Sequence, residues 1–461
     1  MSARRVGLLL LLLGFGGAVE GVWNVRNHVD IGAMGCHVLG SRFDGPSFSF
    51  EETKALEAPA SLRVEIANGF GAVSVLEGRP GSVDVTLRKV VFLRSEDKAR
   101  EFARRIVLET ALEGSTLRVG TNRASLERSD GTTGFETHFE VKLPPGTAVK
   151  VDNDHGAVDV SDVASAEVAG SYESVRVERV AGDARVSGRH GDVSVSGVAG
   201  SLTLSARFGQ AKVRDVKGPA RLEVEHGDVE AEQMGQLSVE IKHGDATLGA
   251  VRGDLELRGE HAGVRIEAVS GRATVSTSYN DVELRDVGGD VRSTVDHGGL
   301  QAVGLKGALQ AELSFGDASL EGIAGALEVK VDHGGVHAKD LQGGAKVKAT
   351  GDDVVLEGFR GPVEVEVQRG SVELTPAGPL TGSVSATAAN GVRLEVPAGS
   401  SFELLATSSR GEVQAELPGL SFKEKSPSRL AATLGGGELR VTLSADHGDV
   451  VLTPRKDVAE R

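Results

Sequence analysis

Short stretches in which hydrophobic and polar residues alternate fill much of the chain from about residue 150 onward. The stretch RLEVEHGD (221–228) is typical, because Leu222 and Val224 are flanked by charged residues and a Gly-Asp pair follows. Alternation over about five residues, bounded by Gly and Asp, predicts a β strand with one buried face. Two such stretches follow each other in HGGLQAVGL (297–305) and KGALQAELS (306–314), so each unit of about 18 residues is predicted to hold two strands.

A ring-bearing residue recurs at one position of this unit, with spacings of 17 or 18 residues. A fixed period of this length indicates a solenoid, in which no single unit can bury its own hydrophobic face and neighbouring units must stack. We therefore predict an all-β protein, a parallel β-solenoid (β-helix-like) with two strands per rung of about 18 residues and two parallel sheets facing each other. The recurring residues are His155, Tyr172, His190, Phe208, His226, His243, His261, Tyr279, His297, Phe315 and His333.

The alternation also predicts which way the rings point. His226 has the same parity as Leu222 and Val224, so the pattern predicts that the rings face inward and form a structural ladder closing one edge of the core. Gly227 then allows a close backbone approach, and Asp228 suits a turn because its carboxylate can accept bonds from nearby amides. His-Gly-Asp is accordingly interpreted as turn structure and not as a catalytic pair.

The flanks of the repeat predict five segments. Residues 6–19 carry no charge and follow Arg4 and Arg5, which is typical of an export signal and also of a short anchor. The stretch SEDKAREFARRIV predicts the only good helix, with Ser95 as its N-cap. The predicted segments are 1–22, a signal peptide or N-terminal membrane anchor; 23–58, a linker; 59–150, a capping β region with a helix at 95–107; 151–375, the regular solenoid; and 376–461, an irregular C-terminal solenoid or cap.

Composition narrows the function classes. The net charge of −15 disfavours binding to nucleic-acid phosphates, so no nucleic-acid partner is expected. Cys36 is the only cysteine, which excludes an internal disulfide and a thiolate metal cluster. The apolar N-terminal segment predicts an extracytoplasmic location, in the periplasm or at the cell surface, with the protein either secreted or associated with the membrane through its N-terminus.

Several stretches resemble the bacterial putative-adhesin family, exported β-strand-repeat proteins of largely undetermined function. VKLPPGTAVKVDNDHGAVDV (141–160) resembles the start of that family's repeats, and HGDVSVSGVAG (190–200) resembles its repeat unit. VPAGSSFELLATSSRGEVQAEL (396–417) and GGGELRVTLSADHGDVVL (435–452) resemble its C-terminal end. The resemblance covers about 60–458 and implies a β-helix-like fold outside the cytoplasm, with no catalytic residues to carry over. This chain departs from the family by having a ring where family repeats often carry Asn.

Three functions remain open. The first is a non-enzymatic structural or adhesive module of the cell envelope that binds an unknown protein or glycan. The second is a polysaccharide lyase or hydrolase, for which Asp352, Asp353 and Arg369 are the best departures from the repeat. The third is a metal-binding roll that uses histidines on consecutive rungs, His226, His243 and His261. We expect the first, with no catalytic, cofactor or metal site and no cofactor.

Overall fold

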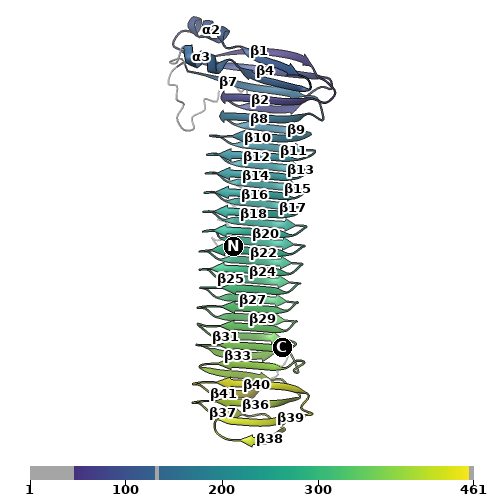
Figure 1. Ribbon diagram of the computed structural model, residues 1–461, viewed down its shortest axis with the longest axis vertical. Coiled ribbons are helices and arrows are strands. Elements are labelled where there is room, and N and C mark those ends of the chain that lie inside the picture. The colour runs from purple at the N-terminus through teal and green to yellow at the C-terminus, as the bar shows by residue number, and fades with distance from the viewer. Residues whose placement is uncertain (1–45, 130–133, 456–461) are drawn as a thin grey trace, which may run out of the picture.

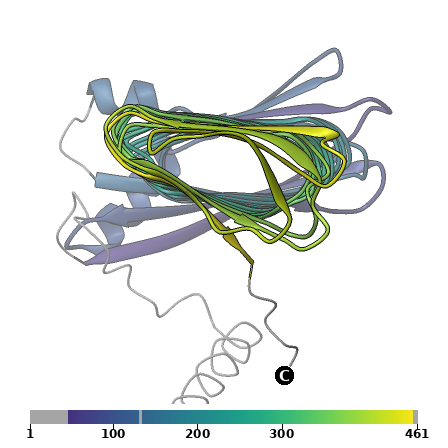
Figure 2. The same ribbon diagram turned by 90° about the horizontal axis from the view of Figure 1, so that it is seen from below.

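The protein forms a long rod of stacked rungs, as a computed structural model shows for residues 46–129 and 134–455 (Figure 1). Each rung contributes one strand to each of two parallel sheets that face each other, and the view along the rod shows a flattened tube (Figure 2). The predicted all-β parallel solenoid with two strands per rung is therefore confirmed.

Sheet B holds the strand of each rung that precedes the ring position. Its regular parallel strands are β8 (Ala148–His155), β10 (Ser165–Gly170), β12 (Ala184–Arg189), β14 (Leu202–Arg207), β16 (Ala220–Glu225), β18 (Leu237–Lys242), β20 (Leu255–Glu260), β22 (Ala273–Ser278), β24 (Val291–Asp296), β26 (Leu309–Leu313), β28 (Leu327–Val331), β30 (Ala345–Ala349), β32 (Val363–Val367) and β34 (Val384–Ala388).

Sheet A holds the strand that follows the ring position. Its regular parallel strands are β9 (Val158–Val163), β11 (Val175–Val180), β13 (Val193–Val198), β15 (Ala211–Val216), β17 (Val229–Met234), β19 (Ala246–Val251), β21 (Val264–Val269), β23 (Val282–Val287), β25 (Leu300–Leu305), β27 (Ala318–Ile323), β29 (Val336–Leu341), β31 (Val354–Phe359), β33 (Ser371–Pro376) and β35 (Gly391–Val396).

The core is built from small aliphatic side chains that stack in register from rung to rung. Ala220 pairs with Leu237, and Leu222 pairs with Val239, across the parallel pair β16–β18. All four side chains are buried, whereas the intervening charged residues face solvent. Because each rung buries its aliphatic face only against its neighbours, stability is shared along the stack.

Sheet A strands from β9 to β31 interrupt the alternation once per rung. The fifth residue adopts the left-handed conformation, as Arg179 does at φ 53° and Asp286 at φ 55°. In β11 the buried positions are consequently Val175, Val177 and Val180, with the irregularity between the second and the third. An extra residue of this kind acts as a bulge that bends the strand toward the next turn.

A mixed sheet region closes the N-terminal end. In sheet A, β1 (Ser47–Glu57), β4 (Ser82–Phe92) and β7 (Gly134–Leu143) pair antiparallel, and β3 (Val73–Glu77) joins β7 to β9. In sheet B, the order is β5 (Leu108–Glu113), β6 (Thr116–Thr121), β2 (Arg63–Phe70) and β8. Residues 47–57 were predicted as part of a linker, and this is wrong, because β1 pairs along its whole length with β4.

Two short helices lie on this end of the rod, α2 (Glu96–Arg105) and α3 (Arg123–Ser129). Helix α2 falls within the predicted helical range, and Ser95 takes the N-cap position without a side-chain cap bond. The buried Lys89 ammonium donates to the carbonyls of Ala103 (3.4 Å) and Ile106 (2.6 Å) and so satisfies the C-terminal end of α2. The prediction missed α3.

The C-terminal end departs from chain order. β40 (Leu439–Ala445) lies between β34 and β36 (Phe402–Ser408), and β41 (Val450–Pro454) lies between β35 and β37 (Val413–Ala415). The last rung of the chain is thus inserted into the stack, and β39 (Arg429–Leu434) and β38 (Leu420–Lys425) complete sheet B with antiparallel pairing.

Neither helix of the described residues is long and apolar enough to cross a membrane. The predicted signal peptide or anchor at 1–22 lies outside the described residues.

Candidate binding surface: the ring ladder and the adjoining groove

Every predicted ring is part of one continuous stack that follows one edge of the rod. Neighbouring ring centroids are 4.4–5.3 Å apart from His155 to His333, and the planes of neighbouring rings differ by at most 24°. Ten rung spacings of about 4.8 Å give this ring ladder a length of about 48 Å.

The predicted inward direction of the rings is wrong. From Tyr172 to His333 all ladder residues are exposed, including Tyr172 (53%), Phe208 (49%) and Tyr279 (51%). Most of them adopt the left-handed conformation, with φ 58° at His190 and 56° at His226. Period-two alternation assumes extended backbone, and a left-handed residue at the corner turns its side chain to the outer side instead.

Two members of this arrangement were missed by sequence reasoning. Phe70 stacks on His155 with a centroid distance of 4.2 Å, and the guanidinium of Arg123 lies 5.1 Å from the Phe70 centroid. Burial lowers the pKa of Arg123, which also donates to the carbonyl of Phe135. Phe70 precedes Gly71 as other rings precede glycine, but it lies 85 residues before His155 and so falls outside the period.

The ladder stops at His333. Gly351 occupies the next ring position without a side chain, and Arg369 follows one rung later. The Nε of Arg369 donates to the carbonyl of Thr350 at 3.3 Å, which ties this arginine to the corner of the neighbouring rung.

Where a Gly-Asp pair follows the ring, as in His226-Gly227-Asp228, both residues have structural contacts at the corner. A Cβ on Gly227 would lie 2.1 Å from the Gly209 carbonyl oxygen, so only glycine permits this approach between rungs. The Oδ1 of Asp228 accepts a hydrogen bond of 2.9 Å from the amide of Asp245 on the next rung, and Asp245 accepts one from Gly263 at 3.2 Å. The carboxylates therefore satisfy corner amides that the strands leave unpaired.

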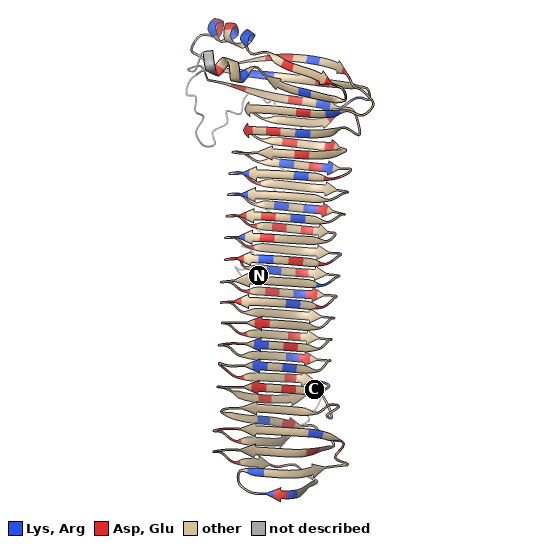
Figure 3. Cartoon of the chain, viewed as in Figure 1, with Lys and Arg blue, Asp and Glu red and all other residues tan. Residues whose placement is uncertain are grey.

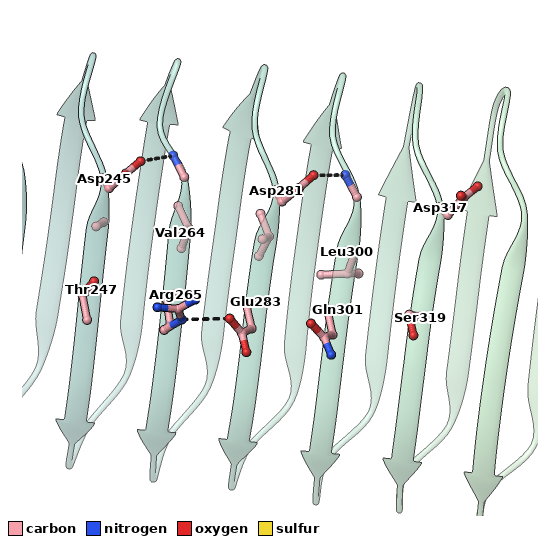
Figure 4. Close-up of a pocket in the computed structure, with 14 residues that line it drawn as sticks. Asp245, Thr247, Val264, Arg265, Asp281, Glu283, Leu300, Gln301, Asp317 and Ser319 are labelled. Carbon is pink, nitrogen blue, oxygen red and sulfur yellow. Dashed lines mark hydrogen bonds and ion pairs between the residues drawn. The ribbon is translucent and has the colours of Figure 1, made fainter. Parts of the chain in front are cut away.

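A shallow groove runs beside the ladder on sheet A, across β19 to β27 (Figure 4). Asp245, Asp281 and Asp317 follow the rings of alternate rungs, and Gly263 and Gly299 lie between them without side chains. The outward side chains along its floor are Thr247, Arg265, Glu283, Gln301 and Ser319.

The charged side chains on the floor of the groove form ion pairs. The Nε of Arg265 lies 2.8 Å from the Glu283 carboxylate, and Arg285 also contacts Glu283. Arg265 above all, with Arg285 adding to it, lowers the pKa of Glu283 below its ordinary value. Similar pairs occur on other rungs, such as Lys348 with Glu366 at 3.0 Å, and charges of both signs are interspersed along the rod (Figure 3).

The stacked histidines of the ladder do not converge on a common point. His226, His243 and His261 stack with centroid distances of 4.8 and 5.0 Å and nearly parallel planes. Their lone pairs lie in the ring planes and therefore run side by side, whereas a shared zinc ion needs nitrogens that converge at about 2.0–2.1 Å. Within the described part of the chain, no group of three or more His, Cys, Asp or Glu side chains could hold a metal ion.

The residues considered for catalysis have separate structural contacts. Asp352 Oδ1 accepts from the amide of Asp353 at 2.8 Å, and Asp353 Oδ1 accepts from the amide of Ser371 at 2.7 Å. Arg369 contacts Thr350, as described above, and no ion pair joins it to either aspartate in the described structure.

Comparison with known proteins finds a family model that matches part of the repeat. Residues 264–453 match the Toastrack DUF4097 family. The predicted resemblance to bacterial adhesin-like repeat proteins is confirmed by this Toastrack match, which includes the groove from β21 onward and the irregular C-terminal end. The ring ladder from His261 to His333 also lies in or directly beside the matched residues.

Curated proteins give no significant match to the chain. One solved structure is similar, a putative cell adhesion protein from Clostridium sporogenes, with 9% identity, a TM-score of 0.15, and coverage of 88% of this chain and 100% of that chain.

Proposed function

We propose that this protein is a non-enzymatic β-solenoid that is exported to the cell envelope and serves there as an adhesin-like structural or surface-binding module. The observation that carries the proposal is the exposed ring ladder, which repeats the same chemistry at nearly every rung over about 48 Å. Catalysis needs one site that differs from its surroundings, whereas a repeated surface suits an extended partner that contacts many rungs at once.

Export is supported by the sequence of the N-terminus. Residues 6–19 are uncharged and follow Arg4 and Arg5, and the chain has a single cysteine. Cell fractionation followed by N-terminal sequencing of the native protein tests this part. We expect the protein in the envelope or the culture medium, and a cytoplasmic protein that retains Met1 would contradict the proposal.

The absence of an enzymatic role is tested with the carbohydrates that β-helix enzymes degrade. We expect the purified protein to leave uronic-acid polymers intact over long incubation. Chain shortening by the native protein that disappears in Asp353→Asn would overturn the non-enzymatic assignment, because Asp353→Asn keeps an acceptor for the Ser371 amide and removes only the carboxylate charge.

A further inference from the structure

We infer that the edge of the ring ladder and the adjoining groove bind a neutral, hydroxyl-rich polysaccharide chain that lies lengthwise along the rod. This inference rests on the proposed surface-binding function and names the chemical class of its partner.

The stack itself does not require histidine. His190 and Phe208 stack at 4.9 Å and Phe208 and His226 at 5.0 Å, which matches the 4.8 Å between His226 and His243. A phenyl ring thus fills the same place in the same geometry. Most rungs nevertheless carry a ring with a polar edge, so the edge has a role that stacking does not explain.

The ladder offers ring edges and not ring faces. Each face between Phe70 and His333 is covered by the neighbouring ring at 5.3 Å or less, so a sugar cannot stack on it. From Tyr172 to His333 the ladder residues are exposed, and most of them are histidines, with the phenols of Tyr172 and Tyr279 among them. A neutral imidazole presents one donor and one acceptor, which is the combination that a sugar hydroxyl also has.

The imidazole edges have unused hydrogen-bonding capacity. In the described structure, no hydrogen bond or ion pair to another residue engages the ring nitrogens of five exposed ladder histidines. These histidines are His190, His226, His243, His261 and His333. Three of them, His226, His243 and His261, lie on consecutive rungs, so a ligand meets donors and acceptors about 4.8 Å apart there without displacing a protein contact.

The groove supplies the same kind of groups beside the ladder. His243 and His261 precede Asp245 and Gly263, which line it, and Thr247, Gln301 and Ser319 place hydroxyls and an amide along its floor (Figure 4). The carboxylates at its margin can accept hydrogen bonds from hydroxyls, but they repel an acidic polymer. Together with the net charge of −15, they favour a neutral glycan over a polyanion.

Affinity electrophoresis tests the inference with the native protein in gels that contain a soluble neutral β-glucan, polygalacturonate or no polymer. We expect retardation by the β-glucan alone. His243→Phe combined with His261→Phe keeps two stacked rings and removes their nitrogens, and we expect it to weaken the affinity roughly tenfold. Gln301→Ala tests the groove floor and should weaken binding by a smaller factor.

Lys217→Ala combined with Gln236→Ala alters two exposed residues on the opposite edge of the rod and should bind as the native protein does. Equal retardation of the His243→Phe, His261→Phe protein and the native protein would overturn the inference, and so would retardation by polygalacturonate alone. If the double variant does not fold, NMR of labelled histidine in the native protein replaces it. Ladder imidazole signals should then shift on β-glucan addition, and unchanged signals would contradict the inference.

These outcomes separate the inference from the proposed function. A protein that is found in the envelope and captures envelope proteins, but binds no neutral polysaccharide, retains the proposed function and loses the inference. A cytoplasmic protein loses the proposed function whatever it binds in a gel.

Discussion

At the scale of single residues, glycine is required at some corners because the backbones of neighbouring rungs approach too closely for a Cβ atom. A Cβ on Gly227 would lie 2.1 Å from the Gly209 carbonyl, whereas a Cβ on Gly249 would meet no atom within 4 Å. We expect Gly227→Ala to lower the free energy of unfolding by about 1–3 kcal/mol or more, because the rungs must separate to admit the methyl group. Gly249→Ala is the matched control and should be neutral or slightly stabilising. Urea unfolding of both variants checks this, and equal midpoints would refute the close approach.

The stacking contribution of a single ladder ring is measurable at His243, which has a ring on either side at 4.8 and 5.0 Å. His243→Ala removes both stacks, and since such pairs contribute about 0.5–1.5 kcal/mol each, the variant should lose about 1–3 kcal/mol of stability. His243→Phe preserves both and should match the native protein. A loss of stability in His243→Phe as large as in His243→Ala would show that the imidazole, and not the ring stack, stabilises this corner.

At the scale of elements, alternation predicted the strands because extended residues expose and bury their side chains in turn. Leu222 and Val224 therefore point inward as expected. The same rule gave the wrong side-chain direction at His226, where φ is 56°. Nothing in the sequence His-Gly-Asp indicates that the histidine itself adopts the left-handed conformation. The sequence thus predicted the rings as an inward structural ladder, whereas the structure places them on the outer side of the corner.

The ion pairs of Glu283, one of which joins neighbouring strands, predict a response to acid. Arg265 on β21 and Arg285 on β23 lower the pKa of Glu283 in the folded protein. The unfolded chain then binds the proton more readily, so this stabilisation is present above the unfolded pKa of about 4.3 and is lost as the pH falls through the lower folded value. Melting temperatures measured from pH 6 down to pH 2.5 should decline less steeply in Glu283→Gln than in the native protein. Identical slopes would contradict the assigned cause.

At the scale of the whole molecule, the 18-residue period of the sequence predicted the rod, but only the structure shows the order of its last rungs. The spacing of the repeat becomes irregular after about residue 375. This indicates that the C-terminal end differs from the regular rungs, but it does not predict the order of the strands there. In the structure β40 pairs with both β34 and β36, so a strand late in the chain lies between two earlier ones. Pairing between strands so far apart leaves no periodic mark in the sequence, because each strand retains the same alternation wherever it is placed.

The stacked architecture makes the length of the rod adjustable by whole rungs. Deletion of 279–296 removes one complete rung and joins Ser278 to His297, so both sheets and the ring ladder can close again in register. We expect a folded protein whose maximum dimension, measured by small-angle X-ray scattering, is shorter by about 4.8 Å.

Deletion of Glu283 alone is the control. It shifts the rest of β23 by one residue and turns Leu284 from the core to solvent, so it should unfold the middle of the rod although it removes far less of the chain. If the deletion of Glu283 destabilised the protein less than the deletion of 279–296, the burial of alternate side chains could not be what stabilises the strands.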